Sequence, residues 1–206
     1  LQCKKKVSFS SSFGVNNIPY DETIARCLNE FDAISVRETA GAKIVNEMTG
    51  RDPTILVDPT MLLSNDEWRS VSRKPKKVKE GYILTYFLSP MCDCAKERLD
   101  EIREGREVYE LLNPEDKVAG DAGPSEFLWL FDHADIILTD SFHACVFSFL
   151  FNKPFIVFDR NWSGGNINSR IETLLLKFSL ERKYYCNIRV NEIWEHDYEE
   201  GYKPLE

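Results

Sequence analysis

The sequence predicts an α/β fold built from parallel β-sheets with helices on both faces. Short apolar runs rich in β-branched residues alternate along the chain with amphipathic helical patterns, an alternation typical of parallel strands joined by helices. The composition agrees, because 43 % of the 206 residues are hydrophobic and 29 % are charged, which suits a buried core with a solvated surface. The same composition excludes collagen-like, coiled-coil and disordered chains.

The first part of the chain contains three predicted strands, each followed by a helical pattern. The strands are expected at Val7–Ser10, Ala33–Val36 and Thr54–Val57. Asp21 is placed to cap a helix that runs to about Glu30, and Gly50 is placed to end the helix after the second strand. Ser64 opens a short third helix, since Glu67 stands three residues later, as in a capping box.

The second part of the chain repeats this alternation with four strands. They are expected at Tyr82–Leu88, Glu107–Leu112, Asp135–Thr139 and Phe155–Phe158. The helices are expected at Ala95–Arg103, Pro124–Phe131, Ser141–Phe151 and from Ile167 onward.

The segment Ser72–Glu80 separates these two parts, because five of its nine residues are lysine or arginine and hardly any is apolar. Two interpretations stay open: a solvated linker, or a basic patch that faces an anionic partner. We take the segment as the lobe boundary. It divides the chain into residues 1–75 and residues 76–206, the second lobe carrying the C-terminal tail.

Several common functions are disfavoured by what the sequence lacks. The chain has 26 Lys and Arg against 34 Asp and Glu, a net charge of −8, so no nucleic-acid partner is expected. No apolar run reaches the roughly 18–20 residues that span a bilayer. The common phosphate-binding glycine loops, the H-E-x-x-H and G-x-S-x-G motifs and an Asp-x-Asp pair are missing, which disfavours dehydrogenases, common hydrolases and metal-dependent glycosyltransferases.

The six cysteines point to a reducing compartment, because a chain with an ordinary core needs no disulfides for stability. Cys27 and Cys145 lie in apolar helical patterns, which suit buried thiols. Cys92 and Cys94 are separated by one residue and have no second ligand pair nearby, so an exposed loop is expected there rather than a metal site.

Three polar segments follow predicted strands or open predicted helices, which is where ligands bind in parallel sheets. Arg37 could hold an anion bidentately, or form an ordinary surface pair with the next residue. Asp140, Ser141 and His143 begin a very apolar helix whose first N–H groups favour an anion; the alternative is a simple cap and a core histidine. Arg170 lies in the first turn of the last helix, where a cation is unfavourable unless an anion is near.

Six short motifs, which include the polar segments around Arg37, Asp140 and Arg170, occur in order along the chain. They are Ser35–Glu38, Val57–Thr60, Gly123–Leu128, Thr139–His143, Asn152–Phe155 and Asn168–Ile171. In this order they resemble the motifs of the polysaccharide pyruvyl transferase family, and the resemblance covers nearly the whole chain, from Val7 to about Arg182. Ala144 departs from the family pattern, which usually has glycine after the Asp-Ser-Phe-His run.

The resemblance implies two Rossmann-like lobes arranged as in glycosyltransferase-B enzymes, with a chain that starts inside the first lobe. It also implies transfer of the pyruvyl group of phosphoenolpyruvate to sugar hydroxyls, with release of phosphate and without a metal or other cofactor. Arg37, Ser141, His143 and Arg170 are then expected to bind the donor. His143 is expected to be catalytic together with Asp140, which would orient the imidazole from the same turn.

The expected acceptor is a saccharide or a lipid-linked saccharide, used in the cytoplasm or at a membrane surface without a spanning helix. A homo-oligomer is compatible with the sequence. Two other functions stay open on the same scaffold: a sugar-nucleotide glycosyltransferase, and a catalytically silent protein that binds carbohydrate or serves in assembly.

Overall fold

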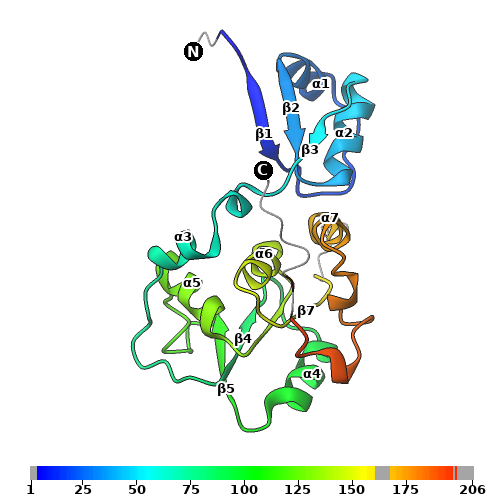
Figure 1. Ribbon diagram of the computed structural model, residues 1–206. Coiled ribbons are helices and arrows are strands. Elements are labelled where there is room, and N and C mark those ends of the chain that lie inside the picture. Colours follow the sequence, from blue (N-terminus) through cyan, green and yellow to red (C-terminus); the bar gives the residue numbers. More distant parts are fainter. Residues whose placement is uncertain (1–3, 161–167, 197, 199–206) are drawn as a thin grey trace. The chain divides into compact units, whose positions relative to one another are not determined.

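The computed structural model describes residues 4–160, 168–196 and 198, and it divides the chain into two compact units (Figure 1). The first unit comprises residues 1–59 and 162–177, and the second comprises residues 60–161 and 178–206. Every strand pair within the described sheets is parallel, so the predicted α/β class with parallel sheets is confirmed.

The first unit contains a three-stranded sheet in the order β1-β2-β3. Its strands are β1 (Val7–Ser11), β2 (Ala33–Val36) and β3 (Thr54–Ile55), and its helices are α1 (Glu22–Asn29), α2 (Thr39–Thr49) and α7 (Ser169–Lys177). The predicted caps are confirmed: the Asp21 carboxylate accepts two N–H groups of the first turn of α1, and Gly50 ends α2 at a φ of 70°. Apolar residues of α1 and α2 form the core with those of β2.

The second unit contains a four-stranded sheet in the order β5-β4-β6-β7. Its strands are β4 (Tyr82–Tyr86), β5 (Glu107–Leu111), β6 (Ile136–Thr139) and β7 (Phe155–Val157). Its α-helices are α3 (Asn65–Ser70), α4 (Asp93–Arg103), α5 (Pro124–His133) and α6 (Phe142–Leu150). Short 3-10 helices lie at η1 (Pro59–Leu62), η2 (Glu181–Lys183) and η3 (Val190–Glu192). The capping box predicted at Ser64 is present at the start of α3.

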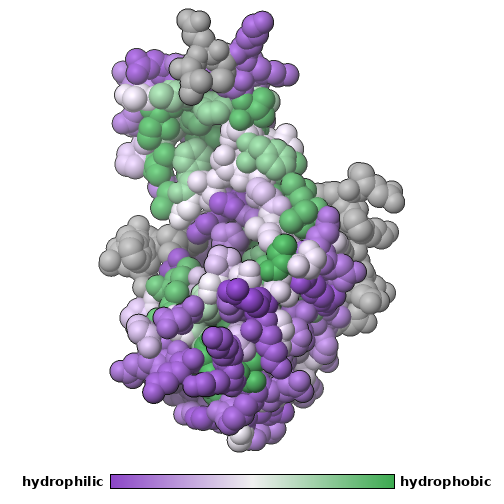
Figure 2. All heavy atoms as spheres, turned by 90° about the vertical axis from the view of Figure 1, so that its left-hand side faces the viewer, coloured by the Kyte–Doolittle hydropathy of each residue, from purple (hydrophilic) through white to green (hydrophobic). Residues whose placement is uncertain are grey.

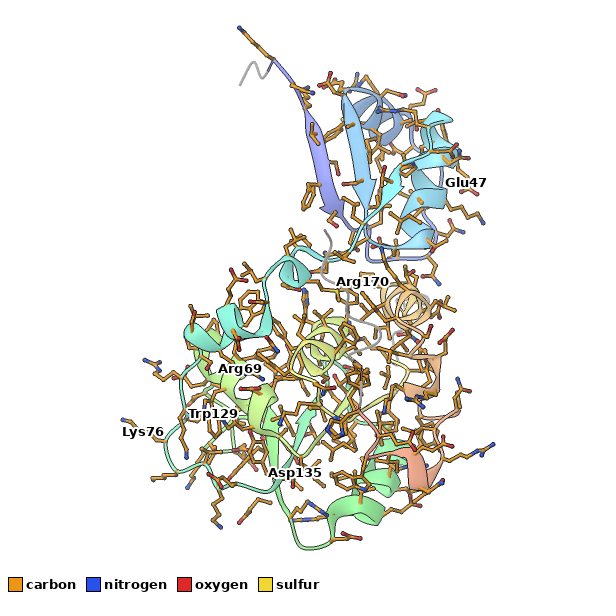
Figure 3. The ribbon with its side chains drawn as sticks, in the orientation of Figure 1. Glu47, Arg69, Lys76, Trp129, Asp135 and Arg170 are labelled. Atoms are coloured by element: carbon orange, nitrogen blue, oxygen red, sulfur yellow. The ribbon has the colours of Figure 1, made fainter. Side chains whose placement is uncertain are left out.

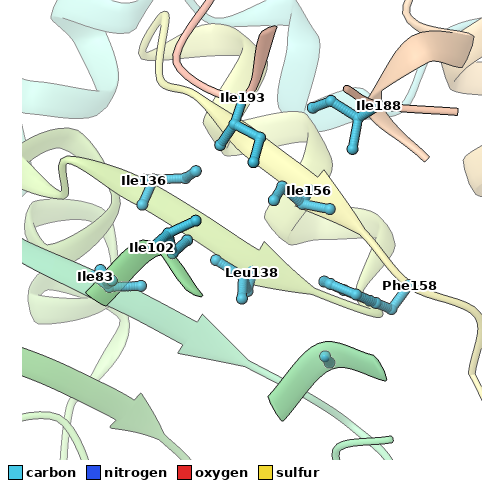
Figure 4. Close-up of a cluster of buried hydrophobic side chains, with 9 residues drawn as sticks. Ile83, Ile102, Ile136, Leu138, Ile156, Phe158, Ile188 and Ile193 are labelled. Atoms are coloured by element: carbon cyan, nitrogen blue, oxygen red, sulfur yellow. The ribbon is translucent and has the colours of Figure 1, made fainter. Parts of the chain in front are cut away.

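The core of the second unit lies on its two central strands, β4 and β6. Ile83, Ile136 and Leu138 are fully buried and pack with Ile156 of β7 (Figure 4). Ile188 and Ile193 of the C-terminal segment cover the same cluster, so residues beyond the last helix belong to this core. Strands β4, β6 and β7 are buried almost throughout, as expected for strands covered on both faces, whereas the edge strand β5 carries Glu107 and Glu110.

The two units divide the chain differently from the boundary expected at residue 75. Helix α3 belongs to the second unit, because Trp68 packs edge-on against Phe147 of α6 at 5.3 Å between ring centroids and Arg69 pairs with Asp132 of α5 at 3.0 Å. Helix α7 belongs to the first unit, where the Thr39 N–H at the start of α2 donates to its Thr173 hydroxyl at 3.2 Å. Patterns of composition cannot show a chain that returns to an earlier unit.

The basic segment Ser72–Glu80 lies along the surface of the second unit. The Lys74 ammonium is 5.3 Å from the centroid of the Trp129 ring, and the Lys79 N–H donates to the Tyr109 hydroxyl at 2.9 Å. Figure 3 labels Trp129 and Lys76, whose side chain is exposed. The segment is therefore a linker that packs on the surface of the second unit, and its exposed lysines face solvent.

Candidate functional site

The carboxyl edge of the second sheet is organised around Asp140, which directly follows β6. Its carboxylate is buried and accepts the Leu88 N–H at 2.7 Å, the Ser89 N–H at 3.0 Å and the Ser89 hydroxyl at 2.7 Å. Leu88 and Ser89 follow β4, the neighbouring strand. Asp140 thereby fixes the loop after β4 to the start of α6, which gives this edge a defined shape.

Arg160 completes this arrangement from the carboxyl end of β7. Its Nη2 donates to the Asp140 carbonyl at 3.0 Å, its Nε lies 3.5 Å from the Asp140 carboxylate, and only 14 % of its side chain is exposed. The structure shows Leu88, Ser89 and Arg160 as partners of Asp140, and the orientation of His143 by Asp140 stays a prediction. A guanidinium and a carboxylate buried together hold each other in place.

Arg160 was missed by the sequence analysis, although a signal for it exists. The residue lies three positions after the last strand residue of β7, at the edge where Arg37 and Asp140 were recognised in their own sheets. The apolar run extends to Phe158, one residue beyond the end of β7 at Val157, and this conceals how close Arg160 lies to the edge of the sheet.

His143 lies in the first turn of α6 and is exposed. Ser141 is the buried N-cap residue, with its N–H donating to the Thr139 hydroxyl at 2.9 Å. The positive end of the helix dipole favours an anion here, and an imidazole in this position can donate a hydrogen bond to it or transfer a proton. The alternative of a core histidine does not fit the exposure of His143. Ala144 is fully buried, so its extra methyl group belongs to the core.

Cys145 of α6 is buried and does not take part in chemistry at the start of this helix. Cys145 is fully buried, and burial raises the pKa of its thiol, with the negative charge of Asp140 acting in the same direction. A thiol whose pKa is raised in this way stays protonated and is a poor nucleophile. Among the groups at the start of α6, His143 is therefore the one suited to moving a proton.

In the first unit, Arg37 directly follows β2 and forms an ion pair with Asp58, which lies after β3. The Asp58 side chain is buried and 20 % of the Arg37 side chain is exposed. Glu38, the residue suggested as a surface partner of Arg37, is buried and accepts the Phe13 N–H at 2.9 Å. Gly41 makes room for it, since a Cβ there would lie 2.9 Å from the Glu38 carboxylate.

Arg170 is the second residue of α7 and is half-buried, between the buried Ser169 and Ile171 (Figure 3). The structure thus places Arg37 and Arg170 in the first unit and brings Asp140, Ser141 and His143 together with Arg160 in the second. Ile167, where the last helix was expected to start, and Cys3 lie outside the described residues.

Other features bear on cofactors and membranes. The described part of the chain contains no group of three or more side chains that could hold a metal ion. The sulfur atoms of Cys92 and Cys94 lie 2.6 Å apart at the start of α4, half-buried rather than in the exposed loop that the sequence suggested. No helix among the described residues is long and apolar enough to cross a membrane.

Comparison with known proteins identifies the family. The family model for polysaccharide pyruvyl transferase matches residues 1–161, which is most of the chain. The protein therefore belongs to the polysaccharide pyruvyl transferase family, and it is a transferase whose family attaches pyruvyl groups to polysaccharides. No curated protein matches the chain.

Proposed function

We propose that this protein transfers the pyruvyl group of phosphoenolpyruvate to two hydroxyls of a saccharide acceptor, forming a ketal and releasing phosphate. The observation that carries the proposal is His143, an exposed imidazole in the first turn of α6, beside the buried Asp140–Arg160 pair. That the transferred group is pyruvyl and the acceptor a polysaccharide follows from membership of the family. A doubly charged small donor matches the positive end of a helix.

The proposed reaction balances without a redox partner. A proton adds to the methylene carbon of phosphoenolpyruvate and turns it into a methyl group, which leaves a cationic centre at the neighbouring carbon. One sugar hydroxyl attacks that carbon, phosphate leaves, and a second hydroxyl closes the ketal. The two hydroxyls lose two protons; one is balanced by the proton on the methyl group, and the other leaves with the phosphate.

His143 is the proposed acid and phosphate contact in this reaction. Ser141 adds its hydroxyl group at the same helix start, and Asp140 acts as a positioning residue through the loop that it holds. Arg37 and Arg170 are proposed as donor-binding cations on the resemblance of their motifs, and Asp58 then fixes the direction of the Arg37 guanidinium. The proposal includes a glycosyltransferase-B-like arrangement of the lobes and a cytoplasmic enzyme that accepts a free or lipid-linked saccharide.

The test is release of phosphate from phosphoenolpyruvate by the purified protein, with and without a panel of oligosaccharide acceptors. Release should depend on the acceptor, and His143→Gln should lower kcat by roughly 10²–10⁴-fold, the range of general acid catalysis. His196→Gln is the matched control, because His196 is exposed and its Nδ1 forms a hydrogen bond with the nearby Trp194 carbonyl.

Arg37 is tested with lysine rather than alanine, because alanine would also take the charged partner from buried Asp58. Arg37→Lys keeps the positive charge but loses the planar fork, so affinity for phosphoenolpyruvate should fall while the unit stays folded. Acceptor-independent release, or full activity in His143→Gln, would overturn the proposal. Turnover of a nucleotide sugar without any response to phosphoenolpyruvate would assign the protein to the glycosyltransferases.

A further inference from the structure

The second unit carries a pocket of about 390 Å³ at the carboxyl edge of its sheet, which we call the aromatic pocket. Four aromatic side chains line the pocket: Trp68, Tyr86, Phe127 and Phe147. Leu111, Leu112 and small residues just before and at the start of α5 complete its lining. Its size falls within the range of roughly 300–1,000 Å³ typical of small-molecule sites. The face of the second unit in Figure 2 is largely hydrophilic, with hydrophobic side chains gathered in places among the charged ones.

The aromatic pocket lies one helical turn from His143. Phe147 stands four residues after His143 on α6, so the two side chains lie on the same face of that helix. Tyr86 pairs in register with Thr139, whose hydroxyl donates to the Tyr86 carbonyl at 2.6 Å. The pocket therefore borders the β6–α6 junction that carries Asp140 and the proposed acid.

The lining favours a neutral ligand with an apolar face. Among the described residues that line the aromatic pocket none is charged, so they offer an anionic donor no ion pair. Its rings meet edge to face: Tyr86 and Phe127 at 5.5 Å between centroids, and Phe127 and Phe147 at 5.7 Å. Burial raises the pKa of Tyr86, although the positive charge of Arg160 acts against it, so the hydroxyl stays a neutral hydrogen-bond donor. The C–H face of a pyranose ring together with its hydroxyls fits this combination.

Leu112 gives an independent sign that something binds here. It lies on the wall of the aromatic pocket, it is 59 % exposed, and its φ is 68°. A leucine in the left-handed region is strained, and glycine or asparagine would be the ordinary residue there. Neither core packing nor backbone preference explains an exposed, strained leucine, whereas contact with a ligand does.

We propose that the aromatic pocket binds a neutral sugar residue of the acceptor, next to the residue that receives the pyruvyl group. This assignment rests on the proposed function, in which the acceptor hydroxyls must reach the donor near His143. Saccharide is favoured over an apolar chain because the family acts on polysaccharide and because the Tyr86 hydroxyl offers a polar group beside the rings.

The experiment labels the protein with 5-fluorotryptophan and follows the fluorine resonances by NMR without any phosphoenolpyruvate. Trp68 is the only tryptophan among the described lining residues, and its resonance is assigned from its loss in Trp68→Phe. The probes are cellobiose, lactose, mannobiose and chitobiose, with geranyl phosphate as the apolar-chain probe. At least one disaccharide should shift the Trp68 resonance saturably, and the other assigned tryptophan resonances should stay in place.

Leu112→Asn tests the wall of the pocket without endangering the fold, because asparagine tolerates the left-handed backbone. It should weaken disaccharide binding by about threefold to tenfold, the loss expected when part of a leucine contact disappears. Val190→Asn is the matched control, since Val190 is 62 % exposed in the same unit and lies outside the pocket.

The outcomes separate this assignment from the proposed function. Saturable disaccharide binding that Leu112→Asn weakens and Val190→Asn leaves intact supports a saccharide subsite, whatever the donor proves to be. A shift with geranyl phosphate alone, equal loss in both variants, or no shift with any disaccharide overturns it. Titration of the same samples with phosphoenolpyruvate tests the donor separately and should be unaffected by Leu112→Asn.

Discussion

Replacement of Asp140 by asparagine tests whether this residue holds the carboxyl edge of the second sheet together. The carboxylate uses one oxygen for the Leu88 N–H and the other for the Ser89 N–H and hydroxyl. An asparagine offers one oxygen and one NH₂ group in the same space. In either orientation of the amide, an NH₂ group faces a backbone N–H, so at least one buried donor loses its acceptor. Arg160 loses its charged partner as well.

The expected loss of stability is large for a change of one atom. A hydrogen bond to a charged group contributes about 1.5–3 kcal/mol, and removal of one partner of a buried ion pair costs about 3–5 kcal/mol. These contributions overlap in a single network, so Asp140→Asn should lower the free energy of unfolding of the second unit by about 3–5 kcal/mol. The loop at Leu88 and Ser89 should exchange its amide hydrogens faster in the variant.

The assay is urea unfolding followed by circular dichroism, with Asp135→Asn as the matched control. Asp135, which Figure 3 labels, precedes β6. Asp140 follows β6, so the two residues lie at opposite ends of one strand. The Asp135 side chain is 37 % exposed and pairs with Arg106 at 3.3 Å, an interaction that should contribute no more than about 1 kcal/mol. Equal effects of the two substitutions would refute the view that Asp140 organises this edge.

Three further predictions concern the titration of Lys183, the reactivity of two cysteines and the capping of α3. Burial lowers the pKa of Lys183 to about 8, so with rising pH the folded state loses this proton before the unfolded state does. The free energy of unfolding should therefore rise between pH 8 and about 10.5, by up to roughly 3 kcal/mol. Urea unfolding at several pH values should show this rise, and Lys183→Met should remove it. Maleimide should modify the exposed Cys186 at least about tenfold faster than the buried Cys145. Mass spectrometry of the peptides measures the two rates, and equal rates would contradict the burial of α6. Ser64→Ala should lower the free energy of unfolding by about 1 kcal/mol and speed amide hydrogen exchange across α3, which carries Trp68. Unchanged exchange would show that the capping box does not stabilise this helix.

Local patterns in the sequence predicted the elements well, because short-range chemistry decides where they begin and end. Asp21, Gly50 and the Ser64 capping box act as their residue types suggest. Apolar runs found the strands, although β3 ends at Ile55, two residues before the expected end at Val57. Its last expected residues leave the sheet on the way to Asp58 and Pro59, a turn that the apolar run conceals.

Long-range features could not be predicted from the sequence. Two partners of Asp140, Leu88 and Ser89, lie some fifty residues away on the loop after β4, and no local pattern connects them with it. The ion pair of Arg37 with Asp58 joins two motifs that were recognised separately. The aromatic pocket assembles residues from α3, β4, α5 and α6, each of which is an ordinary apolar position in its own element. The left-handed backbone of Leu112 has no sequence signal, since leucine is unusual there.

The central claim is that the methylene carbon of phosphoenolpyruvate gains one proton and becomes a methyl group while the neighbouring carbon is captured by the sugar hydroxyls. The most direct measurement is NMR of the acceptor after incubation with phosphoenolpyruvate labelled with carbon-13 at that position, in heavy water. The account predicts a ketal methyl group that carries one deuterium, formed by the wild-type protein and by His196→Gln but much more slowly by His143→Gln. A labelled methylene group that survives on the acceptor, or an acceptor that gains no label, would contradict it.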